Sequence, residues 1–368
     1  MNMTPYTDRL LRHARFGQSE IVRELRRCPL GFVDVGARGN VDPALAQLAG
    51  VTAVLGFEPD PEEARRLQMA GRGPWAEFSI EMAALGEREG PATLYLATEP
   101  NNHSLRPTNA GFVQRYAMEK FFPAGSVPLD TTTLDRVIFE KRAGDSFLGE
   151  FLKVDTQGTE LEILKGARRT LDERTKVVVC EVEFAPIYSD QALFSDVELF
   201  MRDCGFAFFG FSELHARSRK RLDKTTHGGR ERLLWSDAIF FKDPIALSDR
   251  PVSGESRWAC LIASAIMLGF YDYALELAEW AAPIAKDGSV LVTDVLSTIQ
   301  DLARLDTGHA VDDAAVLAEA LKKSPHLANV LVGQFVDRRR RIHDYDDIRL
   351  ESPWLGRTQT LSWEPQQR

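Results

Sequence analysis

The chain has 368 residues, of which 44% are hydrophobic and 27% are charged, a composition typical of folded rather than disordered proteins. This length exceeds what one hydrophobic core usually supports, so we expect a large domain and a smaller one. The formal net charge of -9 excludes general affinity for nucleic acid or anionic membranes, which requires an excess of Lys and Arg.

The N-terminus lacks the basic cap and apolar stretch of a secretory signal. The longest apolar run, residues 258–271, is shorter than the ~20 residues that cross a bilayer. The four cysteines lie far apart and form no zinc-binding pattern with histidines. The sequence therefore predicts a cytoplasmic protein with reduced thiols, no membrane span and no zinc site.

In chain order, residues 1–28 mix charged and apolar residues at helical spacing, which predicts a helical leader. Over residues 29–245, short apolar runs alternate with helical stretches, which predicts an α/β fold with a doubly wound parallel sheet. The runs are residues 31–35, 51–57, 78–85, 151–154 and 177–182. Two later runs, 206–211 and 238–241, leave no room for a helix between them, so we expect an antiparallel hairpin whose basic connection spans 212–235.

A stretch rich in turn-forming residues follows residue 242 and suits a domain boundary. Residues 255–345 are predicted to be helical and resemble part of a tetratricopeptide hairpin, although no repeat returns at the period of about 34 residues. We expect a small all-helical appendix there, which could serve a homodimer or a protein partner, and a C-terminal tail over 346–368.

The first predicted strand ends in Asp34 and is followed by Gly36, where the backbone can bend sharply and approach a ligand closely. The second strand ends in Glu58, where nucleoside-binding folds receive ribose hydroxyls. A nicotinamide-dependent dehydrogenase shares this pattern, but its GxGxxG turn would need glycines at Arg38 and Val41. A cofactor without pyrophosphate, such as S-adenosylmethionine, therefore fits better.

The most specific stretch is FLKVDTQGTE over residues 151–160, which is followed by LEILKGA. With four further blocks in the same order and spacing, it resembles the FkbM family of methyltransferases from about residue 30 to residue 243. The further blocks are DVGA at 34–37, FEP at 57–59, TLD at 133–135 and EVEF at 181–184.

This resemblance implies a class I methyltransferase fold, which is Rossmann-like with an antiparallel last strand, and S-adenosylmethionine as methyl donor. It also implies O-methylation of a hydroxyl on a sugar, a nucleotide-linked sugar or a natural product. The residues then expected at the cofactor are Asp34, Gly36, Ala37, Arg38, Glu58, Pro59, Ala84, Leu85 and Asp155.

Asp155 ends the fourth predicted strand, at the edge where such sheets hold ligands, and is the strongest catalytic candidate. Glu181 and Glu183 end the fifth strand, and we expect at most one to face the pocket, with Glu183 favoured. His103 lies in a loop where a neutral imidazole can take the acceptor proton, although a solvated position explains it too. Glu160 is the last catalytic candidate, with a first-turn helix position as the alternative.

Gln157 stands where the family commonly has an acid, which weakens any case for a divalent metal at Asp155, Glu160 and Glu183. The basic connection contains Arg217, Arg219 and Arg221. We expect these arginines to guide an anionic acceptor, such as a nucleotide-linked or acidic sugar, unless the segment is merely a solvated loop.

A second hypothesis is a catalytically lost module that binds a nucleotide sugar or a protein partner. The presence of Asp34, Glu58, Asp155 and Glu183 argues against it, because a pure binding module would not need all four carboxylates.

Overall fold

The structure, a computed structural model, describes residues 7–39, 41, 45–145, 147–219, 231–247 and 257–339. The chain divides into two compact units. The first comprises Met1–Asp223 and Gly228–Thr307, and the second comprises Lys224–His227 and Gly308–Arg368.

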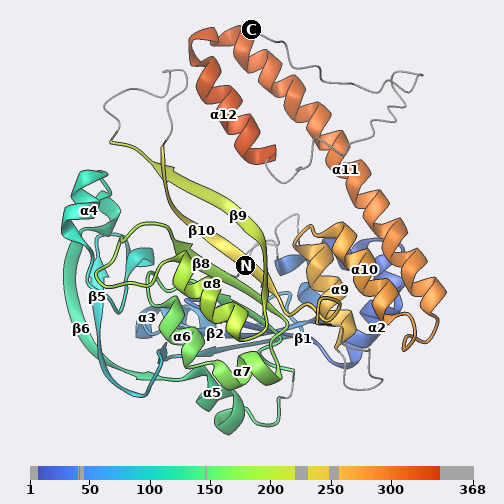
Figure 1. The fold of residues 1–368 in the computed structure, drawn as a ribbon, viewed down its shortest axis with the longest axis horizontal. Coiled ribbons are helices and arrows are strands. Elements are labelled where there is room, and N and C mark those ends of the chain that lie inside the picture. The colour runs from blue at the N-terminus through green and yellow to red at the C-terminus, as the bar shows by residue number, and fades with distance from the viewer. Residues whose placement is uncertain are drawn as a thin grey trace. The chain divides into compact units, whose positions relative to one another are not determined.

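A seven-stranded sheet with the order β3-β2-β1-β7-β8-β10-β9 forms the centre of the first unit (Figure 1). Strands β3, β2, β1, β7 and β8 run parallel, whereas β10 is antiparallel to both β8 and β9. The predicted α/β sheet is thus confirmed, as a mixed sheet. Its strands are β1 (Leu30–Val35), β2 (Thr52–Phe57), β3 (Glu77–Glu81), β7 (Phe151–Val154), β8 (Val177–Glu183), β9 (Ala207–Arg217) and β10 (Arg232–Phe241).

Every residue of β1 and β2 is buried, which explains their nearly continuous apolar sequences. Because β1, β2, β7 and β8 are parallel, their carboxyl ends meet at one edge of the sheet. The acids that follow these strands in the sequence are thereby brought to the same edge.

Helices cover both faces of this sheet. On one face, α6, α7 and α8 pack against side chains such as Val33 and Leu152. On the other, α2 and α9 pack with Phe32 and Phe151. The helices of the first unit are α1 (Arg9–Arg12), η1 (Phe16–Gln18), α2 (Glu20–Arg27), η2 (Leu45–Val51), α3 (Pro61–Met69), η3 (Pro100–Asn102), α4 (Ala110–Arg115), η4 (Glu119–Phe121), α5 (Leu134–Arg136), η5 (Val137–Lys141), α6 (Glu160–Lys165), α7 (Arg168–Glu173), α8 (Phe194–Asp203), α9 (Trp258–Met267), α10 (Tyr271–Ala281) and the first part of α11 (Gly288–Lys323).

The compact units do not follow the predicted appendix over 255–345. All ten residues of α9 are buried, and its side chains share a core with α2 and the sheet. A helix that is apolar on every side must be covered on every side, so α9 belongs to the unit that contains the sheet. The division falls further on, between Thr307 and Gly308.

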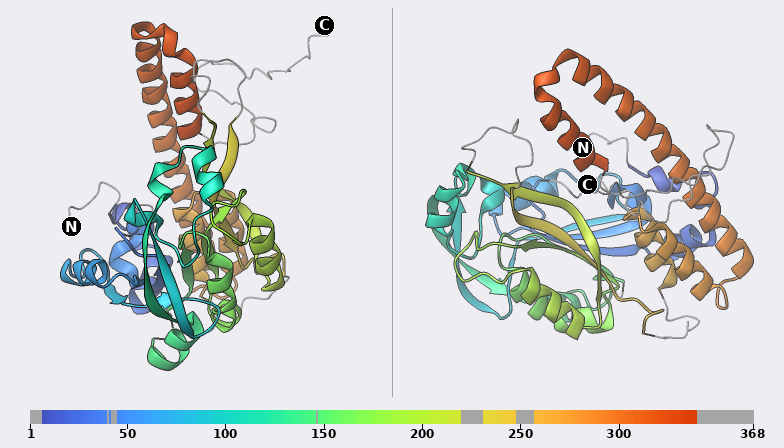
Figure 2. Two further views of the ribbon diagram at one scale, coloured as in Figure 1. Left: turned by 90° about the vertical axis from the view of Figure 1, so that its left-hand side faces the viewer. Right: turned by 45° about the horizontal axis from the view of Figure 1, so that its top comes forward.

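A second, three-stranded sheet with the order β4-β6-β5 stands beside the first, and β5 and β6 form a long curved ribbon (Figure 2). Its strands are β4 (Ala84–Leu85), β5 (Gly90–Ala97) and β6 (Pro123–Thr132). The apolar pattern did not predict β5 or β6, and the expected run 78–85 splits between β3 and β4. The loop between β5 and α4 returns to β5 through a bridge between Tyr95 and Ser104.

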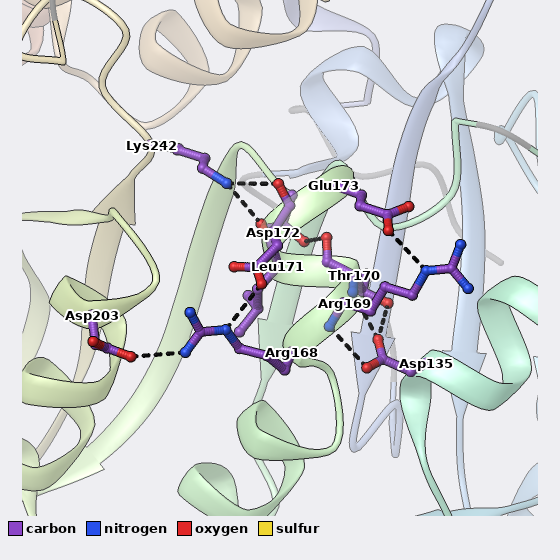
Figure 3. A network of polar contacts seen from close by, with 10 residues as sticks. Asp135, Arg168, Arg169, Thr170, Leu171, Asp172, Glu173, Asp203 and Lys242 are labelled. Carbon is purple, nitrogen blue, oxygen red and sulfur yellow. Dashed lines mark hydrogen bonds and ion pairs between the residues drawn. The ribbon is translucent and has the colours of Figure 1, made fainter.

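Asp135, the last residue of the TLD block, anchors α7 (Figure 3). Asp135 accepts hydrogen bonds from the backbone N–H of Arg169 at 2.9 Å and from the N–H and hydroxyl of Thr170, both at 2.7 Å. At the other end of α7, Lys242 Nζ donates to two main-chain carbonyls at 3.1 and 2.8 Å. Both ends of α7 are therefore satisfied by side chains from other elements.

The described part of the second unit consists of the end of α11, η6 (Pro325–Leu327) and α12 (Ala328–Arg339). The predicted tail over 346–368 lies outside the described residues. No helix within the described ranges is long and apolar enough to cross a membrane.

Candidate functional site

A cavity of about 260 Å³ lies at the carboxyl ends of β1, β2 and β7, where residues 83–85 and the loop 100–105 complete its wall. Most of the predicted site residues line it. They are Gly36, Arg38, Glu58, Pro59, Ala84, Leu85, His103 and Asp155. Asp34, Ala37, Glu160 and Glu183 do not line this cavity.

Gly36 allows the ends of β1 and β7 to approach each other closely. Its φ is +87°, and a Cβ there would lie 2.0 Å from the carbonyl oxygen of Asp155. The backbone N–H of Gly36 donates to the Phe57 carbonyl at 3.2 Å, and that of Asp155 donates to the Val35 carbonyl at 3.0 Å. These contacts draw three strand ends around one cavity.

Glu58 is held against the cavity wall by its neighbours. Its side chain is buried, and Oε1 accepts a hydrogen bond from the backbone N–H of Asp60 at 2.9 Å. Arg38 lies 3.6 Å from the same oxygen and pairs with Asp60 at 2.6 Å. Burial raises the pKa of Glu58, while the Asp60 N–H and the Arg38 guanidinium oppose that rise. Glu58 is therefore held in one orientation, with Arg38 partly balancing its charge, and can accept hydrogen bonds from hydroxyl groups.

Asp155 is fixed through both of its carboxylate oxygens. Lys153 Nζ lies 3.1 Å from Oδ2, and Gln157 Nε2 donates to Oδ1 at 3.1 Å. Burial favours the neutral carboxyl, but the Lys153 ammonium and the hydrogen bonds outweigh it and lower the pKa of Asp155. Asp155 therefore presents a charged carboxylate at the cavity.

The side chain of Glu160 is hydrogen-bonded to the loop that precedes α6. Its side chain is 3% exposed, and its carboxylate accepts from the backbone N–H of Thr156 at 2.8 Å and of Gly158 at 2.9 Å. Burial raises the pKa of Glu160 to about 7. This carboxyl group shapes the 156–158 loop from behind the cavity.

Glu181 and Glu183 are both buried in β8. Burial and the neighbouring carboxylates raise the pKa of each well above the ordinary value. Glu181 accepts a hydrogen bond from Gln157 Nε2 at 2.7 Å. Of the two glutamates, Glu181 is thus the one joined to a residue of the cavity wall, which was not the expected choice.

His103 lines the cavity, and its Nδ1 accepts a hydrogen bond from the backbone N–H of Ala97 at 3.1 Å. Burial and the nearby Arg38 lower the pKa of His103, which favours the neutral imidazole. A neutral ring whose Nδ1 is an acceptor carries its proton on Nε2. In this arrangement His103 presents a donor, which argues against a role as general base.

All four cysteines are free. Among the residues that the structure describes, no group of three or more His, Cys, Asp or Glu side chains could hold a metal ion.

Comparison with known families identifies the part of the chain that builds this cavity. Residues 34–208 match the family model described as the methyltransferase FkbM domain. This part of the chain is a methyltransferase FkbM domain. The family predicted from the sequence blocks is confirmed, and every residue that lines the cavity lies within the FkbM domain.

Two solved structures are similar to the chain. One is methyltransferase FkbM from Methylobacillus flagellatus KT, with 19% identity and a TM-score of 0.32 over 58% of this chain and 43% of that one. The other is magnesium protoporphyrin IX methyltransferase from Synechocystis PCC 6803 with bound SAM, with 9% identity and a TM-score of 0.26 over 59% of this chain and 74% of that one. The chain thus spans less than half the length of the first protein. No curated protein matches it.

Two further polar residues of the FkbM domain were not identified from the sequence. Tyr188 is 1% exposed, and its hydroxyl donates to Gln157 Oε1 at 2.8 Å. Ser104 is also buried and donates to the carbonyl oxygen of Gln157 at 2.6 Å. Neither lies in a family block, so only the folded loops reveal that both contact Gln157.

The basic connection after the FkbM domain is described only in part. Arg217 lies with its guanidinium carbon 5.9 Å from the ring centroid of Trp235, and that ring stacks on His215 with 4.8 Å between centroids. Arg219 is exposed, and Arg221 lies outside the described residues. Neither Arg217 nor Arg219 lines the cavity.

Proposed function

We propose that this chain is an S-adenosylmethionine-dependent O-methyltransferase with a class I, Rossmann-like fold. Its proposed acceptor is a hydroxyl of a sugar, a nucleotide-linked sugar or a natural product. One observation carries the proposal: Gly36, Glu58 and Asp155 come from three different strand ends and line the same cavity of the FkbM domain.

The residues present fit S-adenosylmethionine. Glu58 offers a fixed carboxylate for ribose hydroxyls, and Ala84 and Leu85 offer an apolar wall for a base. Gly36 lets the ends of β1 and β7 meet at this wall, because a Cβ there would clash with the Asp155 carbonyl oxygen. Asp34, in β1, and Ala37, in the turn after β1, do not line the cavity. We assign them to supporting the Gly36 turn.

S-adenosylmethionine, when bound, supplies an activated methyl group. The protein then has to align an acceptor oxygen and hold the proton that leaves it. Asp155 is the proposed base, because its carboxylate faces the cavity and Lys153 keeps it charged. Glu183, which does not line the cavity, and His103, which presents a donor there, rank behind Asp155 as candidates. Glu160 is assigned to fixing the loop beside Asp155.

The hairpin of β9 and β10 carries the groups proposed to bind the acceptor. The stacked rings of His215 and Trp235 lie beside Arg217, and Arg232 stands opposite Arg217 in the strand register. Aromatic rings beside guanidinium groups suit a sugar that carries an anionic substituent. We expect Arg217→Ala to raise the KM for such an acceptor more than the KM for the cofactor. Arg202→Ala, which changes an exposed arginine of α8, is the control.

Titration calorimetry with S-adenosylmethionine tests the proposal. We expect binding to the wild type that Glu58→Gln weakens roughly tenfold to a hundredfold, because a hydrogen bond to a charged group contributes about 1.5–3 kcal/mol. Glu62→Gln, at an exposed position of α3, is the matched control and should bind as the wild type does. Binding of a nicotinamide dinucleotide in place of S-adenosylmethionine would contradict the proposal.

Formation of S-adenosylhomocysteine with a panel of free and nucleotide-linked sugars then tests catalysis. Tight cofactor binding without methyl transfer to any sugar or natural product would favour the alternative, a binding module that has lost catalysis.

A further inference from the structure

A chain of hydrogen bonds links the buried Tyr188 to the cavity. The Tyr188 hydroxyl donates to Gln157 Oε1 at 2.8 Å. The amide nitrogen of Gln157 donates in turn to Asp155 Oδ1 at 3.1 Å and to Glu181 Oε2 at 2.7 Å. Gln157 therefore bridges two carboxyl groups from neighbouring strands, and both Gln157 and Asp155 line the cavity.

The backbone at Gln157 is held in an uncommon conformation. Gln157 has a φ of +64° and Gly158 a φ of +101°. Ser104 donates to the Gln157 carbonyl at 2.6 Å, and a Cβ on Gly158 would lie 2.8 Å from the ring of Tyr188. At a residue other than glycine, such as Gln157, a left-handed backbone costs about 1–3 kcal/mol and persists only where the surroundings enforce it. The loop is thus built around this particular placement of Gln157 and Tyr188.

Asp155 and Tyr188 together set which way the Gln157 amide faces. An ionised carboxylate only accepts hydrogen bonds, so the amide nitrogen faces Asp155, and the amide oxygen accepts from the Tyr188 hydroxyl. The donor end is then directed at Asp155 and Glu181, where it can serve both. An ionised acid at position 157, the residue type common in the family, has no proton to donate to either carboxyl group.

We propose that Tyr188 and Gln157 are positioning residues that hold the Asp155 carboxylate toward the cavity for the bound nucleoside. The inference rests on the proposed function, because it assumes that the cavity holds S-adenosylmethionine. Lys153 anchors the other oxygen of Asp155 at 3.1 Å, so the carboxylate is fixed at both ends.

Titratable groups from several elements surround Asp155 and Lys153. They are Lys153 on β7, Glu181 and Glu183 on β8, Glu160 on α6, Tyr188 in the loop after β8, and Asp34 and Asp237, which act on Lys153 from β1 and β10. Most are acids, so loss of the Gln157 donor would make protonation of Asp155 easier. The charged carboxylate would then be lost at a higher pH.

Tyr188→Phe tests the proposal, because it removes the hydroxyl and keeps the ring. Calorimetry of the full-length protein with S-adenosylmethionine is repeated between about pH 3 and pH 7, because the pKa of Asp155 lies below its ordinary value. It gives the affinity and its pH dependence. We expect about three- to tenfold weaker binding, the effect of one neutral hydrogen bond. As pH falls, binding by the variant should also decline at a higher pH than binding by the wild type. Tyr116→Phe, in the same aromatic cluster, is the matched control.

Gln157→Asn is the second variant, in which the amide is withdrawn by one methylene while the loop keeps a similar residue. Gln157→Asn should show the same weaker binding and the same shift in pH dependence as Tyr188→Phe. S-adenosylhomocysteine, which lacks the sulfonium charge, is titrated in parallel with S-adenosylmethionine. Wild-type affinity and pH dependence in both variants would overturn the proposal. An equal, pH-independent loss of affinity for S-adenosylmethionine and S-adenosylhomocysteine would also overturn it, because that result would indicate a purely structural role for the two residues. No binding by the wild type at any pH would instead remove the proposed function, and this inference with it.

Discussion

Replacing Glu160 by glutamine should change how stability depends on pH. Burial raises the pKa of Glu160 to about 7 from an ordinary value of 4.5. Each unit of pKa difference between the folded and unfolded states corresponds to about 1.4 kcal/mol in the free energy of unfolding. This difference therefore corresponds to a contribution of about 3 kcal/mol. A carboxyl group with a raised pKa binds more protons in the folded state than in the unfolded state. The wild type therefore loses this contribution as pH rises from about 4.5 through 7.

Glu160→Gln removes the ionisation but keeps the size of the side chain. We expect the difference in unfolding free energy, variant minus wild type, to shift by about 3 kcal/mol in favour of the variant between pH 5 and pH 8. Urea unfolding followed by fluorescence of the six tryptophans measures this difference. Glu119→Gln, at an exposed position, should give a flat difference within about 0.5 kcal/mol. A difference for Glu160→Gln that stays constant across this pH range would refute the reasoning.

Three further substitutions test the fold at the site and elsewhere in the first unit. Gly36→Ala should abolish S-adenosylmethionine binding in calorimetry, because its Cβ would lie 2.0 Å from the Asp155 carbonyl oxygen; unchanged binding would show that the turn is not held as described. Arg257→Leu leaves the buried Glu150 without its ion-pair partner and should cost roughly 3–5 kcal/mol in urea unfolding, whereas a loss below about 1 kcal/mol would contradict a buried pair. Asp135→Ala removes the bonds to the first turn of α7 and should cost about 1–2 kcal/mol in the same assay.

Much of the main sheet could be predicted because each central strand is buried on both faces. Such strands leave continuous apolar runs in the sequence, and the acids directly after them mark the edge where ligands bind. Glu58 and Asp155 were found in this way, and both line the cavity. In the small sheet, β5 and β6 do not form such apolar runs. The first six residues of β6 are exposed and include Pro123, Gly125 and Ser126.

The contacts around Asp155 show what a sequence pattern does not convey. Tyr188 lies 31 residues from Gln157, and only the path of the loop after β8 brings its hydroxyl there. Lys153 was within reach of sequence reasoning, since residues two apart on a strand share a face and it precedes Asp155 by two positions. By the same rule Glu181 and Glu183 share a face of β8, so alternation could not choose between them.

A crystal structure with S-adenosylhomocysteine tests the central claim most directly. The claim predicts the ribose hydroxyls within hydrogen-bond distance of the Glu58 carboxylate, with the amino acid portion against the Gly36 turn and the sulfur on the side of Asp155. A nucleoside bound away from these three residues, in a protein whose cavity stays as it is here, would contradict it.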